Sequence, residues 1–181
     1  MRRTFWSHLA ALLLLITPDP CAAAAGAASI VNEAVIDAPA GEVWRLITTK
    51  EGMESWIVPH AEIDLRVGGL LRTNHDPEGT IGDSKTVTNR ILAVEPKRFF
   101  SLKVAGTPAW VPFADYVTGT WYEILLSPLP HGRTRVRCLG YGFGKGPLQF
   151  AARAFVDRGN VWALDRLRKL IAERNGAKSH R

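Results

Sequence analysis

The chain has 181 residues, of which 46% are hydrophobic and 22% are charged, and its formal net charge is +6. This length suits one domain with a single core, and these ordinary fractions exclude a wholly disordered chain. The mild basic excess fits a preference for anionic surfaces or ligands, and it does not require nucleic acid as a partner.

The first 28 residues have the pattern of a secretory signal peptide. The pair Arg2-Arg3 supplies the positive start. The apolar run over 9–16 is too short to span a bilayer, and small residues fill 22–28. Paired arginines occur in ordinary signals and in twin-arginine signals, so both export routes stay open. We expect a signal peptide over 1–28, a mature domain over 29–181, and a periplasmic or secreted location.

The mature sequence opens with one strand and two short helices. Residues 30–36 are rich in β-branched side chains and predict the strand. Pro39, with Glu42 placing negative charge near the N-terminus, predicts the start of the first helix. Thr49 predicts the cap of the second helix, which we expect to reach Trp56.

Strict alternation over 60–67 predicts a half-buried antiparallel strand. The apolar residues at odd positions, Ala61 to Val67, form one face, and the polar residues at even positions form the other. Gly68-Gly69 then indicates a hairpin turn into a return strand over 70–75. The same reading predicts four further strands, over 86–94, 98–104, 116–126 and 133–141.

The period changes to 3.6 residues over 148–173, which predicts one long amphipathic helix. Gly159 and Asn160 could bend or interrupt it. The order is therefore one strand, two short helices, a run of strands and one long helix. Only the long helix can cover the apolar face of such a sheet. We expect an α+β fold in which a curved antiparallel sheet of six or seven strands surrounds the C-terminal helix and leaves an apolar space.

Several segments resemble the SRPBCC superfamily. Ala38-Pro39-Ala40, followed by Val43-Trp44, looks like the opening of these domains. Trp56 and the later Ile63-Asp64-Leu65-Arg66-Val67-Gly68-Gly69 are similar to the branch named for activators of a heat-shock-protein ATPase. Two segments near the end are also similar to that branch: Gly132-Arg133-Thr134-Arg135-Val136 and Gly140-Tyr141-Gly142-Phe143.

The resemblance covers residues 30–173 and implies a helix-grip fold with a cavity for a hydrophobic or amphipathic small molecule. It does not fix a reaction, because this fold hosts carriers, cyclases, hydratases and co-chaperones. A cytosolic chaperone activator would not need an export signal, so we do not expect that role here.

Large aromatic side chains and one carboxylate are the candidates for ligand binding. For the aromatic residues the alternative is plain core packing, because large rings dominate cores in general. The loop over 105–114, which is bounded by prolines, could be a lid, a membrane-touching edge, or a segment tucked against the sheet. The candidate residues are Trp44, Trp56, Phe100, Trp110, Phe113, Trp121, Glu123, Phe155 and Trp162.

The sequence holds no strong catalytic or metal-binding motif. His60, Glu62 and Asp64 share a strand face, but that face should point to solvent, so we expect no metal site and no cofactor. Arg133, Arg135 and Arg137 form a basic ladder that we expect on a solvated face. Gly142, Gly144 and Gly146 lack the spacing of a phosphate loop.

The leading hypothesis is a non-enzymatic binder or carrier of a hydrophobic small molecule, lipid-like or polyketide-like, with transient membrane contact left open. The alternative is an enzyme of the cyclase, dehydratase or hydrolase kind that uses Glu123, Arg90 or His75 from the cavity wall. A third hypothesis is an interaction module that uses the sheet edge or the Trp110 loop. The sequence leaves the oligomeric state open.

Overall fold

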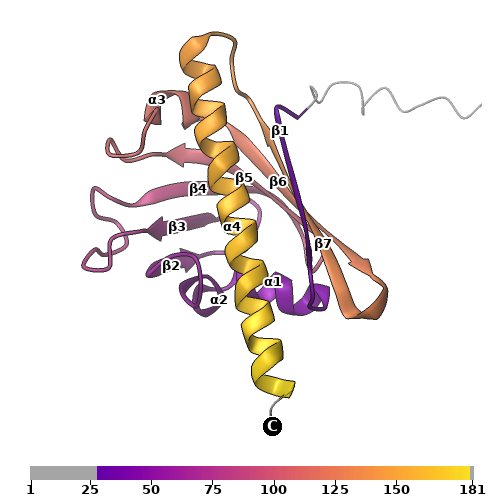
Figure 1. Cartoon of the computed structure of the whole chain (residues 1–181). Coiled ribbons are helices and arrows are strands. Elements are labelled where there is room, and N and C mark those ends of the chain that lie inside the picture. The colour runs from indigo at the N-terminus through magenta and orange to yellow at the C-terminus, as the bar shows by residue number, and fades with distance from the viewer. Residues whose placement is uncertain (1–27, 180–181) are drawn as a thin grey trace, which may run out of the picture.

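One antiparallel sheet of seven strands forms the body of residues 28–179, the part of the chain that the computed structural model describes. The strands follow the order β1-β7-β6-β5-β4-β3-β2, so β2 to β7 form a meander and β1 pairs beside β7 (Figure 1). The signal peptide expected over 1–28 lies outside the described residues except for its last position.

The strands match the predicted positions closely, with two exceptions described below. Each neighbouring pair is antiparallel. The seven strands are β1 (Ile30–Ile36), β2 (His60–Ile63), β3 (Leu70–Asn74), β4 (Val87–Glu95), β5 (Phe99–Gly106), β6 (Trp121–Leu129) and β7 (Arg133–Tyr141).

Two short helices follow the first strand, as predicted. The first buries Val43 and Leu46, and the hydroxyl of Thr49 caps the second by accepting a hydrogen bond from the backbone N–H of Gly52 at 3.0 Å. The helices of the described region are α1 (Ala40–Thr48), α2 (Lys50–Glu54), α3 (Ala114–Val117) and α4 (Pro147–Ser179).

The register of the strands sends one row of side chains toward α4. Ile91 lies opposite Leu102, and Leu102 lies opposite Tyr122. Ile124 lies opposite Cys138, and Cys138 lies opposite Asn32. Because side chains alternate along a strand, these residues share the inner face and their neighbours in sequence share the outer face.

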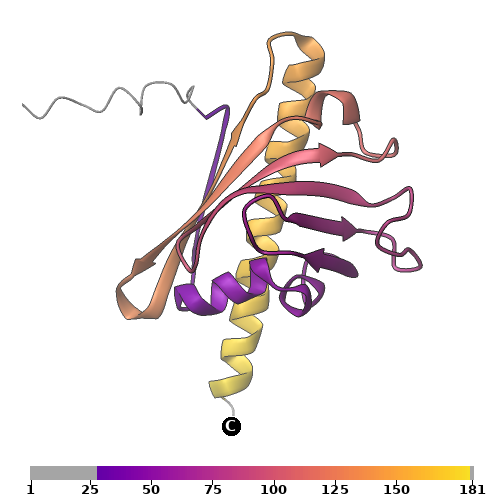
Figure 2. The ribbon, with the colours of Figure 1, turned by 180° about the vertical axis from the view of Figure 1, so that it is seen from behind.

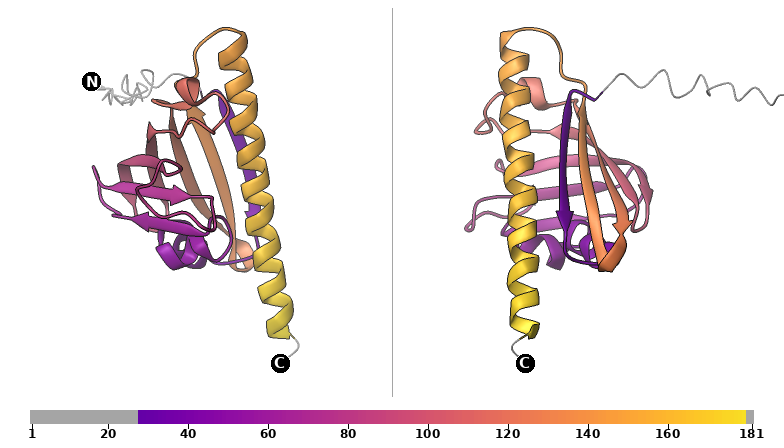
Figure 3. Two further views of the ribbon diagram at one scale, coloured as in Figure 1. Left: turned by 90° about the vertical axis from the view of Figure 1, so that its left-hand side faces the viewer. Right: turned by 45° about the vertical axis from the view of Figure 1, so that its right-hand side comes forward.

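The long helix α4 crosses the inner face of the sheet. Figure 2 shows the sheet from its other side, with α4 behind it, and Figure 3 shows the sheet curving away from the helix. The N-terminal end of α4 lies beside α3, and its C-terminal half lies beside α1 and α2. Arg166 fixes that half by donating to the backbone oxygen of Trp56 at 2.8 Å, and Asn175 donates to that of Asp37 at 2.9 Å. The predicted α+β helix-grip fold is therefore confirmed.

Two predicted strands differ in extent from those observed. The strand predicted over 60–67 ends at Ile63, and Val67 is 62% exposed, because the chain turns early with Gly68 at a φ of +81°. The strand predicted over 116–126 begins only at Trp121. Its first part forms α3 instead, and Gly119, with a φ of +92°, separates the helix from the strand.

Neither Gly159 nor Asn160 interrupts α4, which continues to Ser179. A single glycine inside a helix costs about 1 kcal/mol, which a helix of this length can tolerate. None of the helices within residues 28–179 combines the length and the apolar character that crossing a bilayer requires.

Candidate ligand-binding cavity

Two hydrophobic clusters hold α4 to the sheet. In the larger cluster Leu164, Leu167 and Ile171 pack with Trp44 and Phe100. In the smaller cluster Ala152 packs with two buried valines near α3. The two clusters are separated along the helix, and four residues between them line a cavity.

That cavity has a volume of about 380 Å³ and is called the sheet–helix cavity below. The sheet supplies one wall of the cavity through inward-facing residues of the neighbouring strands β4, β5, β6 and β7. Five of these six side chains are aliphatic or aromatic, and the sixth is a thiol. They are Val87, Leu102, Val104, Tyr122, Ile124 and Cys138.

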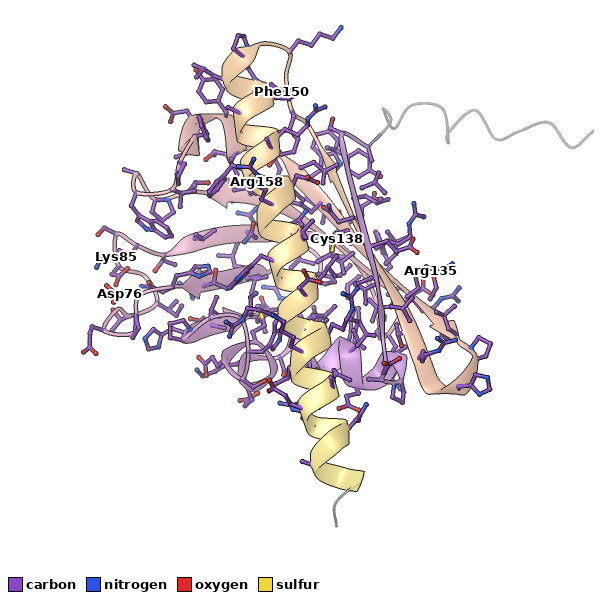
Figure 4. The ribbon with its side chains drawn as sticks, in the orientation of Figure 1. Asp76, Lys85, Arg135, Cys138, Phe150 and Arg158 are labelled. Atoms are coloured by element: carbon purple, nitrogen blue, oxygen red, sulfur yellow. The ribbon has the colours of Figure 1, made fainter. Side chains whose placement is uncertain are left out.

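The helix and two loops supply the other walls. From α4 come Phe155, Val156, Gly159 and Asn160. Figure 4 labels Cys138 beside α4, on the side where β7 lies, and this residue brings β7 into the lining. The residues after β3 and around α3 complete the lining with His75, Thr107, Val111 and Val117.

The lining carries no side chain that is charged at neutral pH. It includes no Asp, Glu, Lys or Arg among the described residues. Burial raises the pKa of the Cys138 thiol to about 12 and also raises the pKa of Tyr122, so both stay protonated. Burial lowers the pKa of His75, which favours the neutral imidazole. The cavity therefore suits a neutral ligand surface.

A polar cluster joins β1 to α4 at the edge of the cavity. Asn32, which is buried on the inner face, donates its amide Nδ2 to Asp157 Oδ1 at 2.8 Å. Asn160 donates its amide Nδ2 to Asn32 Oδ1 at 3.1 Å. These bonds satisfy a buried amide that would otherwise destabilise the fold.

Two aromatic contacts mark the loop side of the cavity. The rings of His75 and Trp110 meet edge to face with centroids 6.3 Å apart, and those of Phe113 and Phe155 lie 6.4 Å apart. Phe113 has a φ of 63°, a conformation that is rare outside glycine, so its backbone is strained in order to start α3. The 105–114 loop thus lies against residues that line the cavity.

The loop that follows β3 is held by polar contacts. Asn74, which is fully buried, donates to the backbone oxygen of Thr80 at 3.0 Å and to Asp83 Oδ1 at 2.9 Å. Asp76 and Lys85, labelled in Figure 4, form an ion pair across the same loop. These contacts fix the backbone next to His75.

The structure separates the predicted ligand-binding residues into four places. Phe155 lines the cavity, and Phe113 and Trp110 lie beside its lining residues. Trp44 and Phe100 lie in the larger cluster instead, where their rings meet edge to face at 5.8 Å. Plain core packing, the alternative considered above, describes where those two rings lie.

Trp56 and Trp162 line a different hollow. It has a volume of about 470 Å³ and lies between the end of α2 and the C-terminal half of α4. Trp162 is 50% exposed and lies under the guanidinium of Arg166, whose Cζ is 5.1 Å from the ring centroid. Charged residues of both signs border this hollow, unlike the sheet–helix cavity.

Trp121 and Glu123 lie on the outer face of the sheet. Trp121 stacks on Tyr141 with centroids 5.6 Å apart, and the Tyr141 hydroxyl donates to Glu123 Oε2 at 2.9 Å. Arg90 is also exposed and donates to the backbone oxygen of Gly68 at 3.0 Å. The sequence could not orient Glu123 and Arg90. Neither lines the cavity, so of the three residues suggested for an enzyme only His75 does.

The remaining polar motifs also lie away from the cavity. His60 Nε2 is 3.0 Å from the backbone oxygen of Pro77, and Glu62 pairs with Arg72 at 2.5 Å. Asp64 pairs with Arg66 at 2.8 Å. Within residues 28–179 no cluster of three His, Cys, Asp or Glu side chains is placed to hold a metal ion.

The predicted arginine ladder runs along the outer face of β7. Arg135, labelled in Figure 4, lies 3.0 Å from Glu33, and Arg137 lies 3.4 Å from the same carboxylate. Both arginines are partly exposed, so these pairs contribute little to stability.

Comparisons with known proteins agree with this geometry. Residues 27–172 match the model of the family described as polyketide cyclase / dehydrase and lipid transport. No curated protein matches the chain. Similar folds occur in several solved structures, which are 24% identical or less and therefore inform the fold alone.

Three of these structures illustrate the likeness. Protein MLL2253 from Mesorhizobium loti is 24% identical with a TM-score of 0.63, and the match covers 80% of this chain and 96% of that one. Aha1 from Colwellia psychrerythraea, solved as a dimer, is 17% identical with a TM-score of 0.60 over 78% and 94%. CalU16 from Micromonospora echinospora is 22% identical with a TM-score of 0.58 over 78% and 72%.

The family match spans the sheet, the cavity and most of α4, and the folds of these neighbours agree with it. The chain therefore belongs to the family of polyketide cyclases, dehydrases and lipid-transport proteins within the SRPBCC superfamily.

Proposed function

We propose that this protein binds a small hydrophobic or amphipathic molecule, lipid-like or polyketide-like, in the sheet–helix cavity and serves as its carrier. The observation that carries the proposal is the cavity itself, which is apolar and has no ionised lining group at neutral pH. The description of its family, which includes lipid transport and polyketide cyclases, supports the same class of ligand.

The volume and lining set the size and strength of such binding. Sites for drug-sized ligands have volumes of about 300–1,000 Å³, so a cavity of about 380 Å³ suits a ligand at the small end of that range. Each 100 Å² of apolar ligand surface removed from water contributes about 2.5 kcal/mol before the entropic cost of association. A ligand with two fused rings or a short alkyl chain could therefore bind measurably.

Gly159 offers a direct test, because a Cβ atom built there meets no other heavy atom within 4 Å, and the residue lines the cavity. The neutral dye N-phenyl-1-naphthylamine, which fluoresces on burial, serves as the probe. Gly159→Leu should fill ligand space and weaken dye binding by about tenfold or more, which corresponds to about 1.4 kcal/mol. Gly159→Ala is the matched variant and should keep affinity within about twofold of the wild type.

Glu123→Gln is a second control, because Glu123 lies on the outer face and should not influence the dye. Native mass spectrometry of the mature protein, recovered from its own compartment, should show a bound molecule in the wild type that Gly159→Leu lacks. Equal dye affinity in the Leu and Ala variants would refute the cavity as the binding site.

An enzyme of the cyclase, dehydratase or hydrolase kind is the second candidate. The observation that favours it is His75, a neutral imidazole at the cavity, which could act as a general base. In that case the molecule that co-purifies with His75→Gln should be an unconverted form of the one found with the wild type. A carrier should release the same molecule from both proteins.

We also propose that the protein acts after export, in the periplasm or outside the cell. The positive, apolar and small-residue order of residues 1–28 supports this proposal. Transient contact with a membrane remains part of the proposal, and the exposed side chains of Trp110 and Phe150, with Arg153 stacked on the latter, support it. Mass measurement of the exported protein would locate the cleavage site.

A further inference from the structure

The polar groups of the sheet–helix cavity carry information about the ligand beyond its apolar character. This inference rests on the proposed function, since it concerns what the cavity selects. Three lining residues, Asn160, Tyr122 and Thr107, take part in side-chain hydrogen bonds with neighbours that do not line the cavity. The bond of Thr107, with Thr118 at 2.9 Å, is exposed, whereas those of Asn160 and Tyr122 are partly buried. The direction of each bond decides whether the group offers the cavity a donor or an acceptor.

The orientation of the Asn160 amide follows from Asp157. A carboxylate has only acceptors, so Asn32 must turn its Nδ2 toward Asp157 Oδ1, 2.8 Å away. The Oδ1 of Asn32 then faces Asn160, and this amide oxygen can only accept a hydrogen bond. Asn160 must therefore present its Nδ2, which lies 3.1 Å from that oxygen.

These two hydrogen bonds do not use the side-chain carbonyl oxygen of Asn160. Its Oδ1 makes no hydrogen bond with any residue in the described part of the chain, and Asn160 lines the cavity. The oxygen is therefore an acceptor that the wall can offer to a ligand. A fixed acceptor in an apolar site discriminates strongly, because a ligand without a matching donor leaves it unpaired.

Tyr122 offers an acceptor for an analogous reason. The hydroxyl of Thr120 lies 2.6 Å from the backbone oxygen of Val117, which has no hydrogen, so the threonine must donate its only proton there. The contact of 3.2 Å between Thr120 Oγ1 and the Tyr122 hydroxyl then requires the proton of Tyr122. The lone pairs of Tyr122 Oη remain for a ligand.

We infer that the cavity selects neutral, largely apolar molecules that carry a hydroxyl or another hydrogen-bond donor, with Asn160 as the specificity-determining residue. Asn32 and Asp157 are positioning residues, because they fix the Asn160 amide without lining the cavity. Tyr122 supplies a second and weaker acceptor. A molecule of the same shape that only accepts hydrogen bonds should bind less tightly.

Three probes with one ring system test the inference: naphthalene, 2-naphthol, which donates, and 2-methoxynaphthalene, which only accepts. Affinities are measured by displacement of N-phenyl-1-naphthylamine. The wild type should prefer 2-naphthol over 2-methoxynaphthalene by about three- to tenfold, the value of one net hydrogen bond. The ratio of the affinities for 2-naphthol and 2-methoxynaphthalene is compared between variants, so that changes in non-specific hydrophobic binding cancel.

Asn160→Leu should bring that ratio close to one while naphthalene still binds. Asp157→Leu should lower the ratio as well, although residue 157 does not line the cavity. Asp157→Asn is the matched variant: its amide oxygen can still accept from Asn32, so it should keep the preference. A merely structural role of Asp157 would lower the affinity for all three probes equally and leave the ratio unchanged. Tyr122→Phe should lower the ratio by a smaller factor.

Circular dichroism establishes whether each variant folds. If Asn160→Leu does not fold, the comparison of Asp157→Leu with Asp157→Asn tests the inference instead. A ratio that Asn160→Leu and Asp157→Leu leave unchanged, or a wild-type preference for 2-methoxynaphthalene, would overturn the inference while the carrier function stands. Failure of all three probes to bind the wild type would overturn both.

Discussion

The two halves of α4 meet the same sheet in different ways. The packed half, Leu164 to Ile171, buries three side chains in the larger cluster. The cavity half, Phe155 to Asn160, borders the sheet–helix cavity. The helix is continuous through both, so the difference does not come from its backbone.

The difference comes from what lies beside the helix. Next to the packed half, α1 and α2 follow β1, and Trp44 and Leu46 join Leu164, Leu167 and Ile171 in the larger cluster. Next to the cavity half, the helix itself contributes Gly159, which has no side chain. At the other end α3 packs with the start of α4 in the smaller cluster, so the cavity lies between two packed ends.

The largest expected effect is a truncation in the packed half. Leu167 is 1% exposed, so Leu167→Ala should lower the free energy of unfolding by about 2–5 kcal/mol through lost burial and a new void. Val156→Ala in the cavity half should cost about 1 kcal/mol or less, since its side chain already borders empty space. Urea unfolding followed by circular dichroism measures both, and equal losses would contradict the comparison.

Enlarging a side chain should have a smaller effect than truncation, and the property affected should differ between the two halves. In the packed half it should lower stability, and in the cavity half it should weaken dye binding. Leu164→Phe should destabilise the protein by about 1–3 kcal/mol, because Leu164 is buried in the larger cluster and a bigger side chain there must displace its neighbours. Val156→Leu should change stability by less than about 1 kcal/mol and should weaken dye binding, since the added methylene enters the cavity. If Val156→Leu left dye binding unchanged and lowered stability as much as Leu164→Phe, the cavity half would be packed as tightly as the packed half.

Much of this fold could be predicted from hydropathy periods alone. The strict alternation after His60 and the change to a 3.6-residue period after Pro147 are local signals, and both mark real elements. The errors fell where a glycine with positive φ decides the path, at Gly68 and Gly119. Composition cannot say which glycine takes that conformation, because the choice depends on the neighbouring strands.

The site was harder to predict, because the sequence could not order the aromatic side chains by depth. Trp44 and Trp121 are the same residue type in apolar segments, yet one is buried under α4 and the other is stacked on the outer face. The register of β6, which was unsettled, decides the position of Glu123. Cys138 and Gly159 were not among the predicted ligand-binding residues, although the alternation with arginines along 133–141 places Cys138 on the apolar face.

The smallest expected effect is a dependence on pH that belongs to the cavity half. Burial lowers the pKa of His75 below its ordinary value of 6.5, so the unfolded chain takes up a proton at this site before the folded protein does. Stability from this residue is therefore fully present above pH 6.5 and is lost as the pH falls toward the folded-state pKa. Because part of the side chain is exposed, the loss should be small.

His75→Gln should remove this component, so the difference in unfolding free energy between variant and wild type should change across that interval and stay constant above it. A ligand that fills the cavity buries the imidazole further. Dye affinity in the wild type should therefore also fall as the pH drops through the folded-state pKa, which lies below 6.5, and the variant should show a flatter profile. Parallel stability curves for the two proteins from pH 8 to pH 5 would mean that His75 is as well hydrated in the folded protein as in the unfolded chain. In that case the loop side of the cavity is open to water, and the entrance is wider than the contact with Trp110 indicates.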